Sequence, residues 1–595
     1  TPTGVAASPA AGTLVARGGA RAAPAGVAAA PAAGAPVATG GALLTLDGIA
    51  ASPAAGVLKT FGVFDLTFIR SAAHPGQYLI EITALQGSDT SSGGIETIGD
   101  GEIASFPIGA EVAGGLADLR YADRDWIGEP NDRFRANVFY DGRAVSPLIM
   151  EAMAPLYPED ERRVQRQFGL IDFINSDGEF DQLTKTLSID GRGVTVRFGP
   201  YMGDYADFVV IASMLGTGWQ AGEDRTSLAV QDQVYSLDLP IQPTFYGGTG
   251  GADGTADFIG KPKPLCYGAV FNVSPVFLDP LNLIYQVHDG AMKSIDAVKD
   301  RGGMLTLDAS GGSGGDVADY AALVAASVGV SKYATCKAQG LLKLGSSPAG
   351  VVTVDMRGDN TGGVYVDTIE GFAIRILETR TEIDMTLVDT ASFHDAVGSS
   401  SGAGLYISAN DVPTTAQVIS SLLGSLGGWW GAAIDGKIRA GRIRDPKTIE
   451  ADKYIDTFDI LNIHPEQEPI PRWRQRVSYA PNYNIQRGED LDVTVTDTMR
   501  QTLAELYSIV TASSSTLQVR HPMAFDPPVL VTQLADKTEA QAVADALQAL
   551  FGVEREIIRI SVKRIGMTIN LGDCVNVNYP RFGLSNGKNF IVIGR

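Results

Sequence analysis

The feature that most constrains the fold is a series of short runs in which apolar and polar residues alternate. Residues 64–69, 78–82 and 194–198 show this pattern, and turn-forming residues bound each run. Alternation with a period of two places every second side chain on one face, which predicts half-buried β-strands. Further short apolar runs cover residues 234–237, 557–562, 568–571 and 590–593. We therefore expect a mainly β chain.

Helical patterns are fewer, and the sequence predicts helices at residues 317–328, 369–379, 415–426, 498–510 and 538–551. The last of these carries the clearest signals. Thr538 and Gln541 have the spacing of a capping box, and Gly552 stands where the helix is expected to end. The expected fold class is therefore mainly β with α+β modules.

The length of 595 residues is enough for about three to five domains. Ala/Gly/Pro-rich units begin at Gly4, Gly26 and Gly48, 22 residues apart, which predicts a strand repeat and leaves a flexible linker as the alternative. The expected division is 1–60 for these repeats, 61–255 for a β-rich domain, 256–395 for a mixed α/β domain, 396–477 for an inserted α/β domain and 478–595 for a C-terminal module of a helix and a β-barrel.

The C-terminal module is expected to contain a turn between two barrel strands at residues 580–584. Pro580 and Gly583 are turn-forming residues, and Gly587 follows shortly after them. Glycine supplies the backbone freedom that such a turn needs. We therefore expect a hairpin near the end of this module.

Charge and composition argue against several classes of protein. The formal net charge is −21, whereas nucleic-acid-binding sites need clustered Lys and Arg. Cys266, Cys336 and Cys574 lie far apart without a CxxC pair, so we expect reduced, buried, structural cysteines. No run approaches the roughly 18 apolar residues of a membrane helix, and no membrane span is expected.

Ser400 lies in a Gly-x-Ser-x-Gly frame over residues 398–402, which resembles a nucleophile elbow. A nucleophile elbow joins a strand to a helix, but residues 403–408 have the pattern of a strand. The interpretation that we favour is a Ser/Gly-rich loop.

Residues 431–437 end in Gly-Lys, like a phosphate-binding loop, but Ile438 stands where a magnesium-binding Ser or Thr is needed. The dipeptide Asp435-Gly436 is a preferred two-residue turn. It predicts a hairpin whose strands cover residues 430–434 and 437–443, with Lys437 in an ordinary structural position.

Other candidate chemistry is weaker still. The five histidines show no pair at metal-ligand spacing, and 68 acidic residues are too many to single out a glycosidase pair. We therefore predict no catalytic, metal-binding or cofactor-binding residues and no cofactor. The adjacent Trp429 and Trp430 are expected to be anchors of the core or of a subunit interface.

Several longer segments resemble one family of proteins. They cover residues 260–290, 335–359, 426–443, 470–486 and 571–594. These segments resemble tail-tip hub proteins of siphophages, which are related to the central hub of contractile-phage baseplates. The resemblance extends over most of the chain from about residue 61, and residues 61–255 and 256–395 would be its first two hub domains.

The resemblance implies a homotrimer whose β-barrel domains form a pseudo-sixfold ring. Such a ring joins a sixfold tail tube to a threefold tip at the distal end of the virion tail. The implied partners are distal tail and tail tube proteins, the tape measure protein, tip or fibre proteins, and phage DNA that passes during genome ejection without specific binding. The candidate structural or interface residues are Trp429, Trp430, Trp473, Arg581, Phe582 and Gly583.

Two other functions stay open. A tail-associated hydrolase of the cell wall or of glycans would need a pocket with convergent reactive groups. A receptor-binding fibre or adhesin would be favoured if the repeats formed a long shaft. A central pore would favour the hub, and an isolated trimeric stalk would favour the adhesin.

Overall fold

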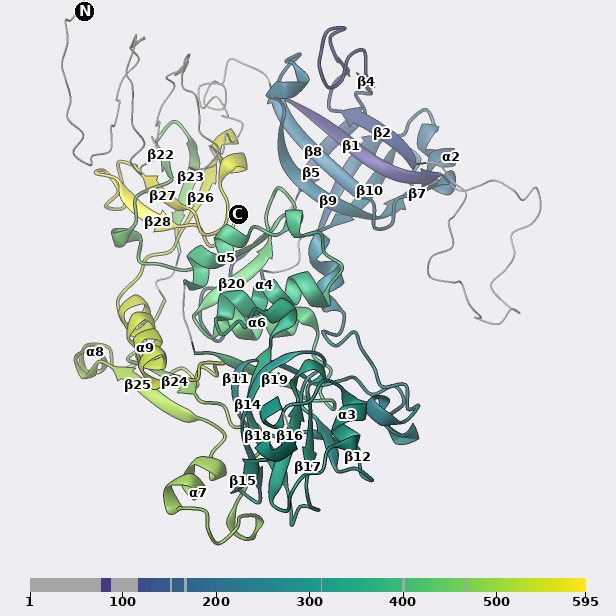
Figure 1. Cartoon of the computed structure of the whole chain (residues 1–595). Helices are drawn as coiled ribbons and strands as arrows, with labels where there is room; N and C mark the ends of the chain where they lie inside the picture. The colour runs from purple at the N-terminus through teal and green to yellow at the C-terminus, as the bar shows by residue number, and fades with distance from the viewer. Residues whose placement is uncertain are drawn as a thin grey trace, which may run out of the picture.

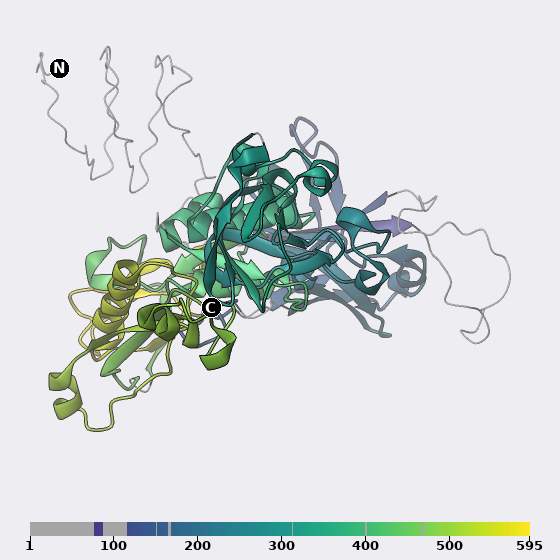
Figure 2. The same ribbon diagram turned by 60° about the horizontal axis from the view of Figure 1, so that its bottom comes forward.

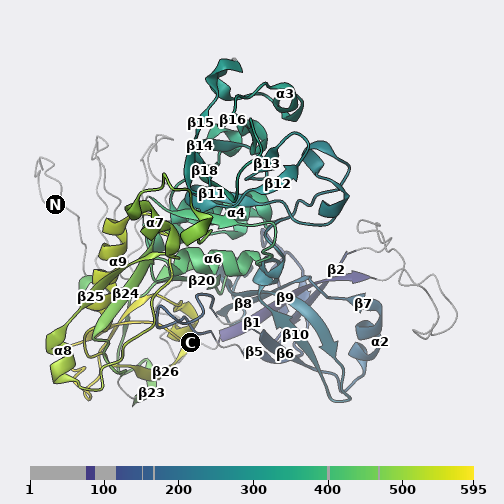
Figure 3. The same ribbon diagram turned by 90° about the horizontal axis from the view of Figure 1, so that it is seen from below.

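The computed structural model describes residues 76–86, 116–149, 152–164, 168–311, 313–398, 402–466 and 469–595. The predicted repeats at 1–60 and the predicted strand at 64–69 lie outside these residues. The described chain is multidomain and rich in β-structure, with two curled half-barrel sheets and a smaller number of helices (Figure 1). The fold class predicted from the alternating pattern is confirmed. Figure 3 shows both half-barrels and the C-terminal strands arranged around helices α4 and α6.

The first half-barrel is an antiparallel sheet with the strand order β2-β1-β8-β9-β10-β6-β5, and β7 pairs with the end of β1. Along β8, Val194, Val196 and Phe198 are buried in alternation, as the sequence predicts. Helix α2 packs Phe180 against one face of the sheet. The elements are β1 (Gly76–Gln86), β2 (Leu116–Ala122), β5 (Ala144–Ile149), β6 (Phe168–Ile174), α2 (Glu179–Thr186), β7 (Leu187–Ser188), β8 (Gly193–Pro200), β9 (Val209–Gln220) and β10 (Arg225–Gln231).

The second half-barrel has the order β12-β13-β17-β16-β15-β14-β18-β11-β19. All its pairs are antiparallel except β15 with β16. Its elements are β11 (Leu265–Val273), β12 (Val276–Asp279), β13 (Ile284–Gln286), β14 (Met292–Asp300), β15 (Gly303–Leu307), β16 (Lys332–Cys336), β17 (Leu341–Leu344), β18 (Val352–Asp359) and β19 (Gly404–Ile407), with helix α3 (Tyr320–Ala325) beside them.

A largely helical core, which we call the central core, connects these sheets. Phe372 of α4, Ile419 of α6 and Trp430 of β20 are inaccessible to solvent and belong to one cluster. That cluster also takes side chains from β11, from β24 and β25, and from α9. The elements are α4 (Ile369–Arg380), α5 (Thr390–Val397), α6 (Thr415–Gly424), β20 (Gly428–Ala432), β21 (Ile438–Arg442), β24 (Arg474–Tyr479), β25 (Ser508–Ser513) and α9 (Lys537–Phe551).

The last group of strands, which we call the C-terminal strand group, forms sheets of its own, separate from the two half-barrels (Figure 2). It has one sheet of order β22-β27-β28 and a separate pair, β23-β26. Its members are β22 (Lys453–Ile455), β23 (Ile460–Pro465), β26 (Ile558–Val562), β27 (Cys574–Val577) and β28 (Lys588–Ile591). Two members precede residue 478, and the boundary expected at 477/478 falls inside β24.

A distant segment also joins the C-terminal strand group. The Ala152 backbone N–H donates to the Arg595 carbonyl, and the Arg595 N–H donates back to the Ala152 carbonyl, at 3.1 and 3.0 Å. The Ala154 N–H donates to Ile593 at 2.8 Å. Residues 152–154 therefore pair with residues 593–595, which come directly after β28.

Two helix predictions are confirmed closely. Helix α4 begins at Ile369, and α6 begins at Thr415 behind a capping box formed by Thr414 and Gln417. The predicted helix at 317–328 forms only in its middle, as α3.

Other helix predictions need correction. Helix α7 (Asp497–Ala504) ends before the predicted residue 510, because β25 begins at Ser508. Helix α9 ends at Gly552 as predicted, but its N-cap is Asp536 and not Thr538, since the Asp536 carboxylate accepts the N–H groups of Thr538 and Glu539. Helices α2, α5 and α8 (Ser515–Arg520) were not predicted.

Two strand predictions are wrong. Residues 234–237 lie in a 3-10 helix, because Val234 and Leu237, three residues apart, both turn into the central core. Residues 568–571 form the end of a 3-10 helix and a turn. The strands predicted at 557–562 and 590–593 correspond to β26 and β28, with small shifts at their ends.

Candidate functional site

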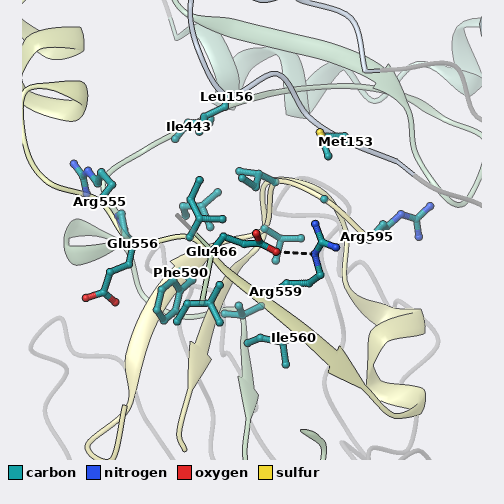
Figure 4. A pocket seen from close by; sticks show the side chains of 18 of the residues that line it. Met153, Leu156, Ile443, Glu466, Arg555, Glu556, Arg559, Ile560, Phe590 and Arg595 are labelled. Carbon is teal, nitrogen blue, oxygen red and sulfur yellow. Dashed lines mark ion pairs between the residues drawn. The ribbon is translucent and has the colours of Figure 1, made fainter. Parts of the chain in front are cut away.

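An apolar cavity of about 810 Å3 lies between the C-terminal strand group and the segment around residues 152–157 (Figure 4). Strands β22, β26, β27 and β28 all contribute side chains to its walls. Met153 and Leu156 lie at one side, and Leu550 and Phe551 from the end of α9 also line it. It is the candidate functional site.

The cavity exists because the inward-facing side chains of these strands do not fill the space between them. Along β26, Ile558, Ile560 and Val562 are partly buried, whereas Arg559, which also lines the cavity, is exposed. The three aliphatic residues line the cavity but stay half-buried. Apolar surface that keeps contact with water is a favourable place for an apolar partner to bind.

The cavity is lined by more cations than anions. Four arginines and two glutamates contribute to it, which stands out on a chain of net charge −21. Both glutamates are neutralised, Glu466 by Arg559 at 3.1 Å and Glu556 by Lys588 at 2.7 Å. Arg555 forms an ion pair at 3.3 Å with an aspartate outside the lining.

The two remaining arginines, Arg444 and Arg595, form no ion pair with any residue that the structure describes. Burial lowers the pKa of the Arg595 guanidinium to about 10, against the opposing effect of Asp573. At neutral pH the Arg595 side chain is charged. The cavity therefore combines an apolar interior with an excess of positive charge.

The lining offers mainly apolar and cationic contacts to a binding partner. The lining residues include no Ser, Thr, Cys, His, Asp or Lys side chain. Its only carboxylates, Glu466 and Glu556, are held in the ion pairs described above. A partner with an apolar surface and negative charge would match both properties of the cavity.

The predicted turn at residues 580–584 is confirmed, between β27 and β28 of the same strand group. Phe582 and Gly583 have φ angles of 59° and 72°. The Phe582 ring stacks on Tyr579, with 6.4 Å between ring centres, and the Arg581 guanidinium lies 5.0 Å from the centre of the Phe582 ring. All three predicted residues, Arg581, Phe582 and Gly583, are exposed, and their role in an interface stays a prediction.

The three tryptophans singled out in the sequence do not lie together at the surface. Trp429 and Trp430 are buried in β20, where Trp430 donates from Nε1 to Ser420 Oγ at 2.9 Å. Of the two expected roles, core and subunit interface, the structure shows the core for both. Trp473 is half-buried just before β24, with the Arg474 guanidinium 4.6 Å from its ring centre.

A second candidate, at the second half-barrel, brings together Cys266, His288 and Asp359. The Cys266 backbone N–H donates to His288 Nδ1 at 3.0 Å, and His288 Nε2 lies 3.9 Å from Asp359 Oδ1. All three are buried, burial raises the pKa of the Cys266 thiol, and burial lowers the pKa of His288 to about 3. Thiolate chemistry needs a lowered thiol pKa and access to solvent, so this cluster is structural.

The most strongly hydrogen-bonded carboxylate of the first half-barrel is Glu81. It accepts from the hydroxyls of Tyr140 and Tyr205 at 2.6 and 2.8 Å and pairs with Arg135 at 2.9 Å and Arg197 at 3.2 Å. Although burial acts in the opposite direction, these contacts lower the Glu81 pKa to about 2. A glycosidase acid needs a raised pKa, so Glu81 has no proton to donate at neutral pH.

The structure describes one of the two motifs that resemble catalytic signatures, the loop with Lys437, but not Ser400 of the other. Ser400 lies outside the described residues, but the strand predicted after it is present as β19. Residues 428–442 form the predicted hairpin, although its turn has three residues and not two, because Ala433 N–H donates to the Lys437 carbonyl. Lys437 thus follows an ordinary turn in which Gly436 has a φ of 77°.

All three cysteines are free and buried, as predicted. Within the described ranges, no group of three or more His, Cys, Asp or Glu side chains is placed to hold a metal ion. No helix in this part of the chain is both long and apolar enough to cross a membrane.

Sequence comparisons give no relative: no family model matches the chain, and no curated protein matches it. Among solved structures, the 43 kDa tail protein of prophage MuSo2 from Shewanella oneidensis is 8% identical, with a TM-score of 0.32 over 77% of this chain and 90% of that chain. A chain from the virion of a native gene transfer agent particle is 11% identical, with a TM-score of 0.17 over 50% of this chain and 84% of that chain. Scores this low do not support an argument about fold or function.

Proposed function

We propose that the chain is a structural subunit of a bacteriophage tail and, more specifically, a homotrimeric hub of the tail tip. In this role it joins the tail tube to tip or fibre proteins and surrounds the path of the DNA at ejection. The proposal combines the family resemblance of its sequence segments with the open architecture of its β-units.

The observation that carries the proposal is that neither large sheet closes on itself. The first sheet has β2 and β5 at its ends and the second has β12 and β19, and only part of these edges is paired, β2 with Asp141 and the start of β19 with Gln533. An open edge presents unpaired backbone N–H and C=O groups, which proteins cover by a neighbouring element or by assembly. Cyclic oligomers reuse one such contact around an axis.

Two of the segments that resemble hub proteins, residues 260–290 and 335–359, lie in the second large sheet, and the other three lie in smaller sheets. Residues 260–290 contain β11 to β13, residues 470–486 contain β24, and residues 571–594 contain the hairpin of β27 and β28. The resemblance therefore covers part of the second large sheet, whose edges would form contacts between subunits, and extends to smaller sheets. The apolar cavity adjoins the last of these segments.

The sites described above favour this structural role over the hydrolase. The Cys266 cluster is closed to solvent, Glu81 is ionised, and the cavity offers no nucleophile among its lining residues. Nothing described so far favours a fibre over a hub.

Mass photometry and negative-stain imaging of the purified chain test the proposal. We expect particles of three times the mass of one chain and rings with threefold symmetry and a central pore. A chain that stays monomeric at high concentration, with no ring of it in intact virions, would contradict the hub. A threefold stalk without a pore would support the adhesin instead.

A further inference from the structure

Residues 488–497 form an acidic loop that presents an apolar side chain to solvent. Leu491 and Val495 turn inward into a small core, and Val493, between them, is 92% exposed. Val493 lies in a turn, where polar residues are the usual choice. Neither the fold of the loop nor its solubility explains a valine there.

The loop is also strongly acidic. Glu489, Asp490 and Asp492 precede Val493, and Asp497 follows it at the start of α7. We call residues 488–497 the Val493 loop. Its outer surface therefore combines an aliphatic side chain with several carboxylates.

Hydrogen bonds hold the Val493 loop in one conformation. The Arg301 guanidinium donates to the carbonyls of Glu489 and Leu491, and the Asp492 N–H donates to the Arg301 carbonyl at 2.7 Å. The Asp492 carboxylate accepts the Thr494 N–H at 2.9 Å. A loop that is ordered before binding loses less conformational entropy when it binds.

The properties of this loop are complementary to those of the cavity. The cavity is apolar, and Arg444 and Arg595 at its lining have no carboxylate partner among the described residues. The loop supplies an apolar side chain with carboxylates on both sides. Complementary charge around an apolar contact favours specific association.

We propose that the Val493 loop of one copy of this chain binds in the arginine-lined cavity of a second copy. The inference rests on the proposed function, since it names a contact between hub subunits. One chain cannot make the contact with itself: in Figure 1, α7, which follows the loop, lies at the opposite end of the molecule from β26 to β28. A contact between two different surfaces generates a ring when its rotation closes.

The mouth of the cavity is accessible to such a loop. Met153 is 64% exposed, and the Arg444 side chain is exposed as well. Arg559, whose ion pair with Glu466 is drawn in Figure 4, is also open to solvent. In this contact Val493 would lie against Ile560 and the residues around it. The carboxylates of the loop would lie near Arg444.

Cysteine cross-linking of the full chain tests the contact directly. We expect the double variant V493C and M153C to form disulfides between chains under mild oxidation, because the three natural cysteines are buried. The matched control replaces Val519 on α8, which is 82% exposed, in the pair V519C and M153C. Cross-linking of the first pair no greater than that of the control would overturn the inference.

A charge exchange supplies a second test. Val493→Asp removes the apolar side chain that would be buried in the contact, so it should weaken self-association at least about tenfold, whereas Val519→Asp should not. Glu489→Arg and Arg444→Glu should each weaken it about three- to tenfold, and their combination should restore it to within about threefold of wild type. If the double variant did not regain association, the pairing of Glu489 with Arg444 would be contradicted, even if each single variant misfolded slightly.

The outcomes separate this inference from the proposed function. Threefold rings that form without dependence on Val493 would overturn the inference and leave the hub in place. Val493-dependent filaments or dimers would support the contact and overturn the threefold ring. A chain that does not associate would overturn both.

Discussion

The central core and the C-terminal strand group both contain large apolar side chains, but these side chains are buried to different degrees. Around Phe372 and Trp430, side chains from four helices and several strands exclude water completely. In the C-terminal strand group, Ile558, Ile560 and Val562 face a cavity and stay half-buried. The comparison indicates that one region is complete within a single chain, whereas the other has apolar surface left for a partner.

The largest effect that would test this comparison is expected at Trp430. Trp430→Ala should lower the free energy of unfolding by about 3–5 kcal/mol, because it opens a large cavity and leaves Ser420 Oγ without its hydrogen-bond donor. Denaturant unfolding followed by circular dichroism measures the change. Trp473→Ala, at a half-buried position, is the control and should lower the free energy of unfolding far less. Equal losses in the two variants would contradict the description of the central core.

A pH dependence is expected from His288, at the second half-barrel. Its pKa is about 3 in the folded chain and 6.5 in its ordinary state, so between these values only the unfolded chain binds the proton. The free energy of unfolding should therefore fall by up to about 1.4 kcal/mol per pH unit below pH 6.5, or about 2 kcal/mol by pH 5. Stability is greatest above pH 6.5.

Thermal unfolding of wild type and His288→Asn between pH 7.5 and 5 isolates this contribution. The variant should be less stable at neutral pH, but it should lose less stability on acidification. If the stability of the two proteins fell with pH along parallel curves, His288 would not titrate as its burial predicts.

A smaller effect is expected at Ile560 in the C-terminal strand group. Ile560→Ala should lower the free energy of unfolding of the isolated chain by about 1 kcal/mol, since part of the side chain stays in contact with water after folding. Ile376→Ala in the central core, where the side chain is inaccessible, should cost about 2–5 kcal/mol. If Ile560 contributes to a contact between subunits, its replacement should weaken assembly more than folding.

The smallest effect is expected at the two motifs that resemble catalytic signatures. Ser400→Ala and Lys437→Ala should leave infectivity near wild type, because Lys437 belongs to a hairpin and Ser400 precedes a strand. A zymogram with peptidoglycan measures any hydrolase activity. A cleared band that either substitution removes would overturn the structural role.

Local signals predicted much of the secondary structure. Helix α6 could be located because Thr414 and Gln417 cap it through side chains three residues apart. The start of α9 was misplaced because Asp536 and Thr538 are both good capping residues, and only the folded chain decides between them. The 3-10 helix at residues 233–238 was missed because the central core, and not the local pattern, determines that Val234 and Leu237 turn inward.

The candidate site could not be predicted in the same way. Its cavity forms where β22 pairs in parallel with β27, a contact between residues more than a hundred positions apart. No local pattern specifies that pairing. The Val493 loop did carry a signal, since Leu491, Val493 and Val495 alternate among acidic residues, but alternation alone does not tell which side faces the core.

The backbone pairing of Ala152 with Arg595 has a consequence for biosynthesis. The segment at residues 152–154 leaves the ribosome early, and its hydrogen-bonding partners at residues 593–595 are translated only after the rest of the described chain. Contacts so distant in sequence form late and slow the completion of folding. Until β26 and β27 are translated, their partners β23 and β22 stay unpaired in the nascent chain, where chaperones would be expected to protect exposed apolar side chains from aggregation.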